Sequence, residues 1–254
     1  MTVRFAVSSS VFVASLWLLQ TRVTSEPAHY LKKIDFAAGP VPQRGPAFFT
    51  YLHYVDRVDG ELTAFGAETT PARGTKLDDD YHYYLPPLRK GDIVPIYGYF
   101  YRVKELFDRD AAKAPRSGDS VHLEWVKDEE LPKGLRVEVS SYIVPLHRDR
   151  NGQTYVNDRF VLVDALHGPK DDKPASASVR LDSPLEVREL KQQDRATVQE
   201  KDVLLIADKA YRVLRIVPRD PKTRVIGWIE LEFRPVPADE LKKLSSVVLP
   251  RPPE

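Results

Sequence analysis

The side chains that could do chemistry are concentrated in the first part of the chain, where tyrosines cluster. Nine of the 12 tyrosines lie between Tyr30 and Tyr101. Aromatic faces with polar rims bind sugars, peptides or other proteins at a low cost in side-chain entropy. The alternative is that these tyrosines fill a core or the space between two modules. The candidate ligand-binding residues are those of the two densest aromatic segments: Tyr81, His82, Tyr83, Tyr84, Tyr97 and Tyr99.

An acidic run precedes the first of these segments. Asp78, Asp79 and Asp80 are followed by His82, and carboxylates with an imidazole can bind divalent cations. However, neighbouring side chains in a strand point in opposite directions, and no second ligand motif follows at a regular spacing. We therefore interpret the run as a solvated loop and predict neither a metal site nor a cofactor.

Sequence motifs do not identify a reaction. The six histidines form no metalloprotease or deaminase motif, and the chain has no nucleophile elbow, phosphate loop or dinucleotide fingerprint. We therefore assign no catalytic residue and favour an exported, non-catalytic binding or structural protein. The alternative is a secreted hydrolase of carbohydrate or peptide substrates that uses carboxylates or the Asp78–His82 region, because paired carboxylates are brought together by the fold and not by sequence spacing.

Composition excludes several classes of protein. The 38 Lys and Arg residues nearly balance the 37 Asp and Glu residues, which argues against a nucleic-acid partner and against a disordered acidic tail. The chain has no cysteine, which excludes a disulfide framework, a thiolate nucleophile and thiolate zinc sites. The expected partner is a protein or glycan outside the cytoplasm.

The N-terminus has the pattern of a secretory signal peptide. Arg4 is followed by an apolar run from Phe5 to Leu19 and by small residues near Ser25. This run is shorter than the roughly 20 residues that a permanent membrane anchor needs. We predict that residues 1–25 are removed on export to the periplasm or the medium, leaving no membrane segment; an uncleaved anchor is the alternative.

The remaining chain is predicted to be all-β. Its 21 prolines disfavour long helices, and β-rich runs flank Asp59-Gly60 and Asn151-Gly152, two dipeptides that suit tight hairpin turns. We expect a hairpin of residues 93–97 and 100–107 followed by a strand at 121–126. Leu106 breaks the alternation of the second strand, and a bulge there would restore it.

Self-comparison indicates an internal repeat. Residues 92–110 match residues 202–220 at seven of 19 positions without a gap, and residues 121–125 match 229–233. Tyr51 also matches Tyr142 upstream. We predict two homologous β-modules in tandem, each a small barrel or sandwich.

The predicted organisation is therefore a signal peptide at 1–25, an aromatic-rich module at 26–133, a second module at 134–236, and a short helix with a proline-rich tail at 237–254.

The repeat serves as an internal control for function. Tyr101-Arg102-Val103 recurs as Tyr211-Arg212-Val213 and is therefore assigned to the fold. In contrast, Tyr97-Gly98-Tyr99-Phe100 becomes Ala207-Asp208-Lys209-Ala210, which makes the first-module aromatics candidates for function. His122 matches Glu230, and both are predicted to lie on a solvent-exposed face.

Overall fold

The computed structural model confirms that the chain is all-β. It describes residues 32–38, 43–44, 48–71, 81–109, 118–138, 141–146, 154–157, 159–170, 173–182, 194–206 and 209–235. The predicted signal peptide, the acidic run 78–80, the turn at 151–152, and the C-terminal helix and tail lie outside these residues. No helix in the described part of the chain has the length and hydropathy of a membrane span.

The first half of the molecule, residues 33–125, has one long sheet and two shorter ones, all antiparallel. The long sheet has the order β1-β11-β10-β9, with β1 (Lys33–Ala37), β9 (Ile93–Ile96), β10 (Tyr99–Phe107) and β11 (Ser120–Trp125). A second has the order β2-β3-β6-β7, with β2 (Gln43–Arg44), β3 (Phe48–Tyr51), β6 (Glu68–Pro71) and β7 (Tyr83–Tyr84). The third has the order β4-β5-β8, with β4 (Tyr54–Val58), β5 (Glu61–Phe65) and β8 (Leu88–Arg89).

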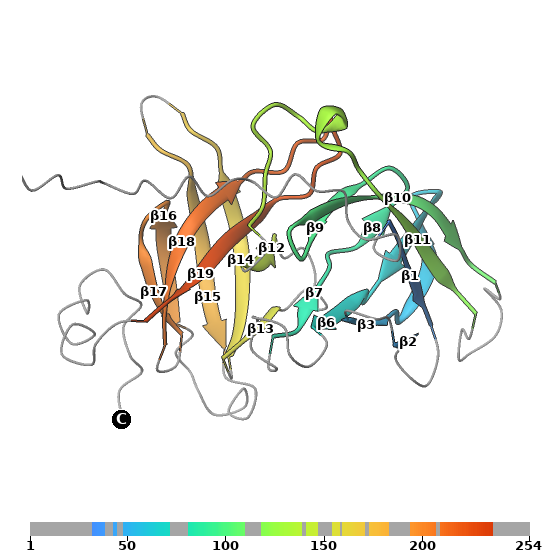
Figure 1. Cartoon of the computed structure of the whole chain (residues 1–254), viewed down its shortest axis with the longest axis horizontal. Helices are drawn as coiled ribbons and strands as arrows, with labels where there is room; N and C mark the ends of the chain where they lie inside the picture. The colour runs from blue at the N-terminus through green and yellow to red at the C-terminus, as the bar shows by residue number, and fades with distance from the viewer. Residues whose placement is uncertain are drawn as a thin grey trace, which may run out of the picture.

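The second half, residues 142–234, has two four-stranded antiparallel sheets. One has the order β12-β19-β18-β17, with β12 (Tyr142–Pro145), β17 (Val203–Ile206), β18 (Lys209–Val217) and β19 (Trp228–Arg234). The other has the order β13-β14-β15-β16, with β13 (Thr154–Val156), β14 (Arg159–His167), β15 (Ser176–Asp182) and β16 (Asp194–Gln199). Figure 1 shows the two halves side by side, with β7, β12 and β13 between them.

The long sheets of the two halves have the same strand order and the same register. β10 pairs with β11 as β18 pairs with β19, and each pair shifts register at one point, after Val103 and after Val213. The first shift is the bulge predicted from Leu106, which is confirmed between Val103 and Glu105. The predicted strands at 93–97, 100–107 and 121–126 are also confirmed as β9, β10 and β11.

Local turn chemistry explains the tight connections. Asp59 and Gly60 both have positive φ, 53° and 84°, as a type I′ turn requires, and they join β4 to β5 as predicted. The second predicted hairpin, with its turn at Asn151-Gly152, is wrong. β12 pairs with β19 and β13 pairs with β14, so the strands flanking Asn151-Gly152 do not pair with each other.

One part of the sequence self-comparison is also wrong. Tyr51 lies on β3, which pairs with β6, whereas Tyr142 lies on β12, which pairs with β19. β12 therefore takes the position in its sheet that β1 takes in the first half, and Tyr142 is not the counterpart of Tyr51.

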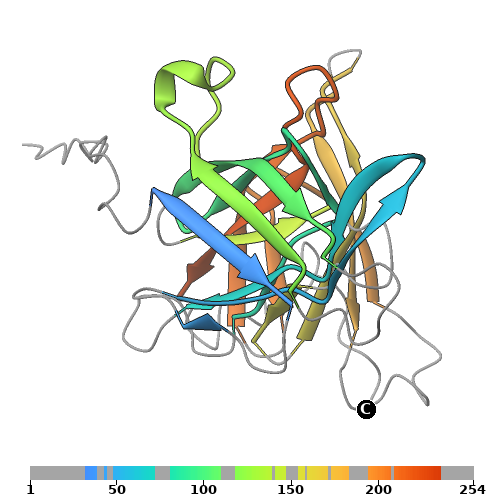
Figure 2. The same ribbon diagram turned by 90° about the vertical axis from the view of Figure 1, so that its right-hand side faces the viewer.

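A single hydrophobic core runs through both halves. It includes Phe36, Tyr101 and Leu123 of the first half together with Tyr211 and Trp228 of the second. The rings of Phe100 and Trp228 lie 5.9 Å apart, so that the long sheets contact each other directly. Viewed from the end, β1, β10 and β11 cross in front of the strands of the second half (Figure 2).

Glu230 is buried, which corrects the prediction that it lies on a solvent-exposed face. Its side chain is 0% exposed, and the connection between the halves contacts it and the neighbouring Arg215. One carboxylate oxygen accepts a hydrogen bond of 2.6 Å from the Glu138 N–H, and the other lies 3.1 Å from the guanidinium of Arg215. Arg215 also donates to the carbonyl of Arg136. His122, the matching residue of the first half, is partly exposed.

Burial raises the pKa of Glu230 above its usual value, while hydrogen bonds from Glu138 and Ser141 and the charge of Arg215 act in the opposite direction. A carboxyl group with a raised pKa binds its proton more tightly in the folded state than in the unfolded state. The stability that it contributes is therefore present below its unfolded pKa and is lost as the pH rises through the folded pKa.

We expect Glu230→Gln to become more stable relative to the wild type as the pH rises above 4.5, the ordinary pKa of the group. The relative gain is about 1.4 kcal/mol for each unit by which the folded pKa exceeds the unfolded pKa. Urea unfolding at a series of pH values measures it. Glu129→Gln, at an exposed position, is the control for loss of one surface charge. A pH-independent difference between Glu230→Gln and the wild type would contradict the buried-carboxyl assignment.

Candidate functional site

Tyr81 connects the two halves and is buried. Its hydroxyl donates a hydrogen bond of 3.0 Å to the carbonyl of Ile143 and accepts one of 2.8 Å from the N–H of the same residue. Its ring contacts Tyr142 edge-on, with 5.0 Å between centroids. At 1% exposure, Tyr81 is not available to a ligand from solvent, and it packs between the halves as the alternative interpretation of the tyrosines describes.

Tyr83 is also buried, and Tyr97 is largely covered. Tyr83 is 1% exposed, and its ring stacks on that of Tyr81 at 6.3 Å. Tyr97 has a φ of 46°, a left-handed conformation that is costly for a bulky side chain, in the turn between β9 and β10. Burial raises the pKa of the Tyr97 hydroxyl, and a hydrogen bond with Thr69 lowers it. Tyr99 begins β10 and is partly buried.

The remaining two predicted residues, His82 and Tyr84, lie in a row of partly exposed rings that we call the aromatic strip. The His82 and Tyr84 rings stack with 6.4 Å between centroids. Tyr155 of the second half contacts His82 edge-on at 5.9 Å and Phe160 at 5.3 Å. The strip therefore runs Tyr84, His82, Tyr155, Phe160, with two rings from each half.

Backbone pairing between the halves positions the strip. The N–H of His82 donates to the carbonyl of Tyr155 at 3.2 Å, and the N–H of Tyr155 donates to the carbonyl of His82 at 3.0 Å. This bridge places the two residues directly opposite each other. Cross-strand neighbours lie within reach of aromatic side chains, so that the rings of the two halves meet.

Glu68 provides a charged rim to the strip. Its Oε1 lies 2.7 Å from Nδ1 of His82, and its side chain is 17% exposed against 39% for the histidine. Burial, followed by the negative charge of Glu68, raises the pKa of Tyr84 to about 12. The phenol is therefore neutral near pH 7, and the strip presents apolar ring faces beside one carboxylate and one imidazole.

This arrangement suits stacking and hydrogen bonding. The rings offer flat surfaces for a sugar or an apolar side chain, and the Glu68–His82 pair offers polar contacts at their edge. In the described part of the chain, no three His, Asp or Glu side chains come together as a metal site. Asp78, Asp79 and Asp80 lie outside that part, so their distance to His82 is not defined.

Sequence reasoning missed Tyr155 and Phe160. Both lie in the half with few tyrosines, and their approach to His82 depends on a bridge between residues 73 positions apart, from 82 to 155. The available local signal was the aromatic and β-branched character of the run from Thr154 to Val163, which predicts strands. Nothing in it indicates a partner in the other half.

No family model, curated protein or solved structure matches this chain. The choice of candidate site therefore depends on the burial and contacts of these residues. By that criterion we choose the aromatic strip as the candidate site and not the full set of predicted residues, because Tyr81 and Tyr83 of that set are buried.

Removing the Tyr81 hydroxyl leaves both backbone groups of Ile143 without their side-chain partner in a buried position. We expect Tyr81→Phe to lower the free energy of unfolding by about 1–3 kcal/mol. Tyr83→Phe is a matched control, because the buried Tyr83 hydroxyl has no hydrogen-bond partner in the structure described. Urea unfolding of both variants measures the difference, and equal stabilities would refute the structural role of the Tyr81 hydroxyl.

Proposed function

We propose that the protein is an exported, non-catalytic binding or structural component that contacts a protein or glycan outside the cytoplasm. The observation that carries this proposal is the aromatic strip, in which partly exposed rings from both halves form one row with a charged rim. Solvent-accessible aromatic clusters are uncommon on protein surfaces that bind no partner or ligand. The apolar N-terminal run with Arg4 before it supports export.

We further propose that the two halves are homologous modules at 26–133 and 134–236. The shared order, register and bulge of the long sheets support this relation. The second sheets add to it, since Gln43 pairs with Thr50 as Thr154 pairs with Val161, a constant offset of 111 residues. A duplicated unit accounts for such agreement between segments that share few side chains.

Comparison of the modules favours a function for His82 and Tyr84. β7 lies at the edge of its sheet beside β6, and β16 lies at the corresponding edge beside β15. β16 has the sequence DRATVQ, without an aromatic residue. The shared fold therefore does not require rings at this edge. A role in binding a partner explains why the first module carries them.

The alternative is a secreted hydrolase that acts through carboxylates or the Asp78–His82 region. One observation supports it: Glu68 orients His82 through Nδ1, which leaves Nε2 as the other ring nitrogen for acid–base chemistry. A binding protein and a hydrolase differ in one measurable respect, which is turnover of the bound ligand.

We expect Tyr84→Ala and Tyr155→Ala each to weaken ligand binding about tenfold, as loss of an aromatic anchor does. The probes are insoluble cellulose, chitin and peptidoglycan together with an array of synthetic peptides, and retention of the purified chain 26–254 is measured. Tyr54→Ala is the matched control, because Tyr54 is a partly exposed ring that stacks on Phe65 outside the strip.

Equal retention of all three variants, or no retention on any probe, would contradict the strip as the contact surface. Release of soluble sugar or cleaved peptide that His82→Gln abolishes would establish the hydrolase instead.

We also expect the secreted chain to begin near Glu26. Expression of the full sequence, followed by fractionation and intact-mass measurement, tests this. A product that retains residues 1–25 in the membrane fraction would show that the N-terminus is an anchor.

A further inference from the structure

The turns that lead into β9 and β17 are built by the same hydrogen bonds. In the first half, the N–H of Arg89 donates to the Asp92 carboxylate at 2.8 Å, and the N–H of Asp92 donates to the Arg89 carbonyl at 3.1 Å. In the second half, Gln199 and Asp202 make the same two bonds, at 2.8 and 3.2 Å. The two turns, and the outer strand edges that follow them, are therefore equivalent positions.

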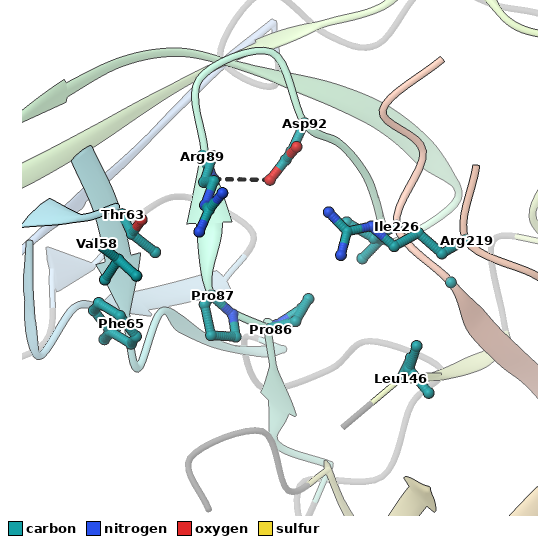
Figure 3. A pocket seen from close by; sticks show the side chains of 11 residues that line it. Val58, Thr63, Phe65, Pro86, Pro87, Arg89, Asp92, Leu146, Arg219 and Ile226 are labelled. Carbon is teal, nitrogen blue, oxygen red and sulfur yellow. Dashed lines mark hydrogen bonds between the residues drawn. The ribbon is translucent and has the colours of Figure 1, made fainter. Parts of the chain in front are cut away.

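In the first half, the loop between β18 and β19 covers this turn and the edge of β9. The N–H of Ile93 donates to the Arg224 carbonyl at 2.9 Å, and the carbonyl of Ile93 accepts from the N–H of Ile226 at 3.1 Å. Nε of Arg224 lies 3.2 Å from the second oxygen of the Asp92 carboxylate. Figure 3 shows the turn beside a pocket, with Ile226 near Asp92 and the bond from Arg89. The edge thus receives two backbone hydrogen bonds and one arginine.

The edge of β17 has none of these partners among the residues that the structure describes. Val203 takes the place of Ile93, and the ladder with β18 directs the N–H and carbonyl groups of Val203 and Leu205 away from β18. No described residue bonds to these groups or to the second oxygen of Asp202. Val203 is 5% exposed, so little of it is open to water. Backbone groups in this state are costly unless another segment bonds to them.

The two edges also differ in sequence. β9 has Pro95 where β17 has Leu205, and proline has no N–H to donate to an added strand. The sequence of β17 is VLLI, with neither a proline nor a charge, and the strand ends its sheet on the side away from the first half (Figure 1). An apolar edge without such safeguards pairs readily with another extended segment.

The end of β19 brings the chain close to this edge. Arg234 lies opposite Ala210 on β18, and Ala210 lies opposite Leu205 on β17. Neighbouring strands are about 4.8 Å apart, so a strand added outside β17 lies about 14 Å from Arg234. Residues 235–245 can span that distance even with two helical turns among them. A chain that crosses there meets the C-terminal end of β17 and runs antiparallel to it.

The sequence that follows residue 245 is suited to an edge strand. Ser246-Val247-Val248-Leu249 combines β-branched and apolar residues and is as long as β17. Pro250 ends the run, because it has no N–H and restricts the residue before it. The segment therefore has the length and the composition to pair with the whole of β17.

We propose that residues 246–249 form a strand on the outer edge of β17 of the same molecule, with Arg251 paired to Asp202. Arg251 follows the segment by two residues and Asp202 directly precedes β17, so an antiparallel strand brings the two together. Their charges are opposite, like those of Arg224 and Asp92. This C-terminal strand completes the second half, as the loop between β18 and β19 completes the first. It closes the edge to other chains and does not depend on the aromatic strip.

Amide hydrogen exchange of the chain 26–254, followed by NMR, tests the proposal. We expect slow exchange of the Val203 and Leu205 amides. The double variant Val247→Pro/Val248→Pro removes both N–H groups from the segment, so we expect these two amides to exchange at least about tenfold faster in it. The Leu204 amide faces β18 and should exchange slowly in every sample, which verifies that the variant is folded.

A second measurement separates loss of the strand from other effects of proline. A chain that ends at Leu244 should show the same fast exchange at Val203 and Leu205, and a synthetic peptide of residues 245–254 should slow it again. Pro252→Ala/Pro253→Ala, a double substitution outside the segment, is the matched control and should exchange as the wild type does.

Three results would overturn the proposal. The first is fast exchange of the Val203 and Leu205 amides in the chain 26–254. The second is unchanged exchange in both the proline variant and the shortened chain. The third is slow exchange only at concentrations at which light scattering finds a dimer, which would place the segment on a second copy.

Discussion

The hydrogen bonds between Tyr81 and the backbone of Ile143 are the contact on which the relative placement of the two halves depends. Both bonds are buried, and an unsatisfied backbone group at that depth is costly, so the halves are held in one arrangement. The bridge between His82 and Tyr155 adds two further bonds one residue away. In this arrangement the rings of His82 and Tyr155 meet, and the aromatic strip is formed from both halves.

The two halves resemble each other in their sheets and differ where they meet. Their long sheets share strand order and register. In contrast, the segment from Tyr81 to Ile93 of the first half bonds to the second half at Tyr81, His82 and Ile93, whereas β16 packs on β15 and β18 of its own half. The features with a proposed function lie along this segment, which is where the symmetry of the fold is broken.

Sequence reasoning succeeded where the determining interactions are local. The turn at Asp59-Gly60, the β9–β10 hairpin and the bulge after Val103 follow from residues close together in the chain. It failed where the partner is distant. Nothing near Glu230 indicates that Glu138 and Arg136 cover it, and nothing near Tyr81 indicates that its hydroxyl meets Ile143, 62 residues away.

The same limit applies to the candidate site. Aromatic density directed attention to residues 81–84, but density alone does not separate buried rings from exposed ones. Alternation along an extended strand does so in part: Tyr81 and Tyr83 face inward, whereas His82 and Tyr84 face outward. Half of the strip remained beyond prediction, because Tyr155 and Phe160 join it only through tertiary structure.

The loop between β18 and β19 has a consequence for the independence of the halves. The N–H of Ile93 donates to the carbonyl of Arg224, and the N–H of Ile226 donates to the carbonyl of Ile93, so this loop covers the outer edge of β9. An uncovered β-edge is a template for pairing with another chain. Although the first half has its own sheets, separating it from the second would expose the edge of β9 to pairing with other chains. The two halves are therefore better regarded as one physical unit than as two detachable parts.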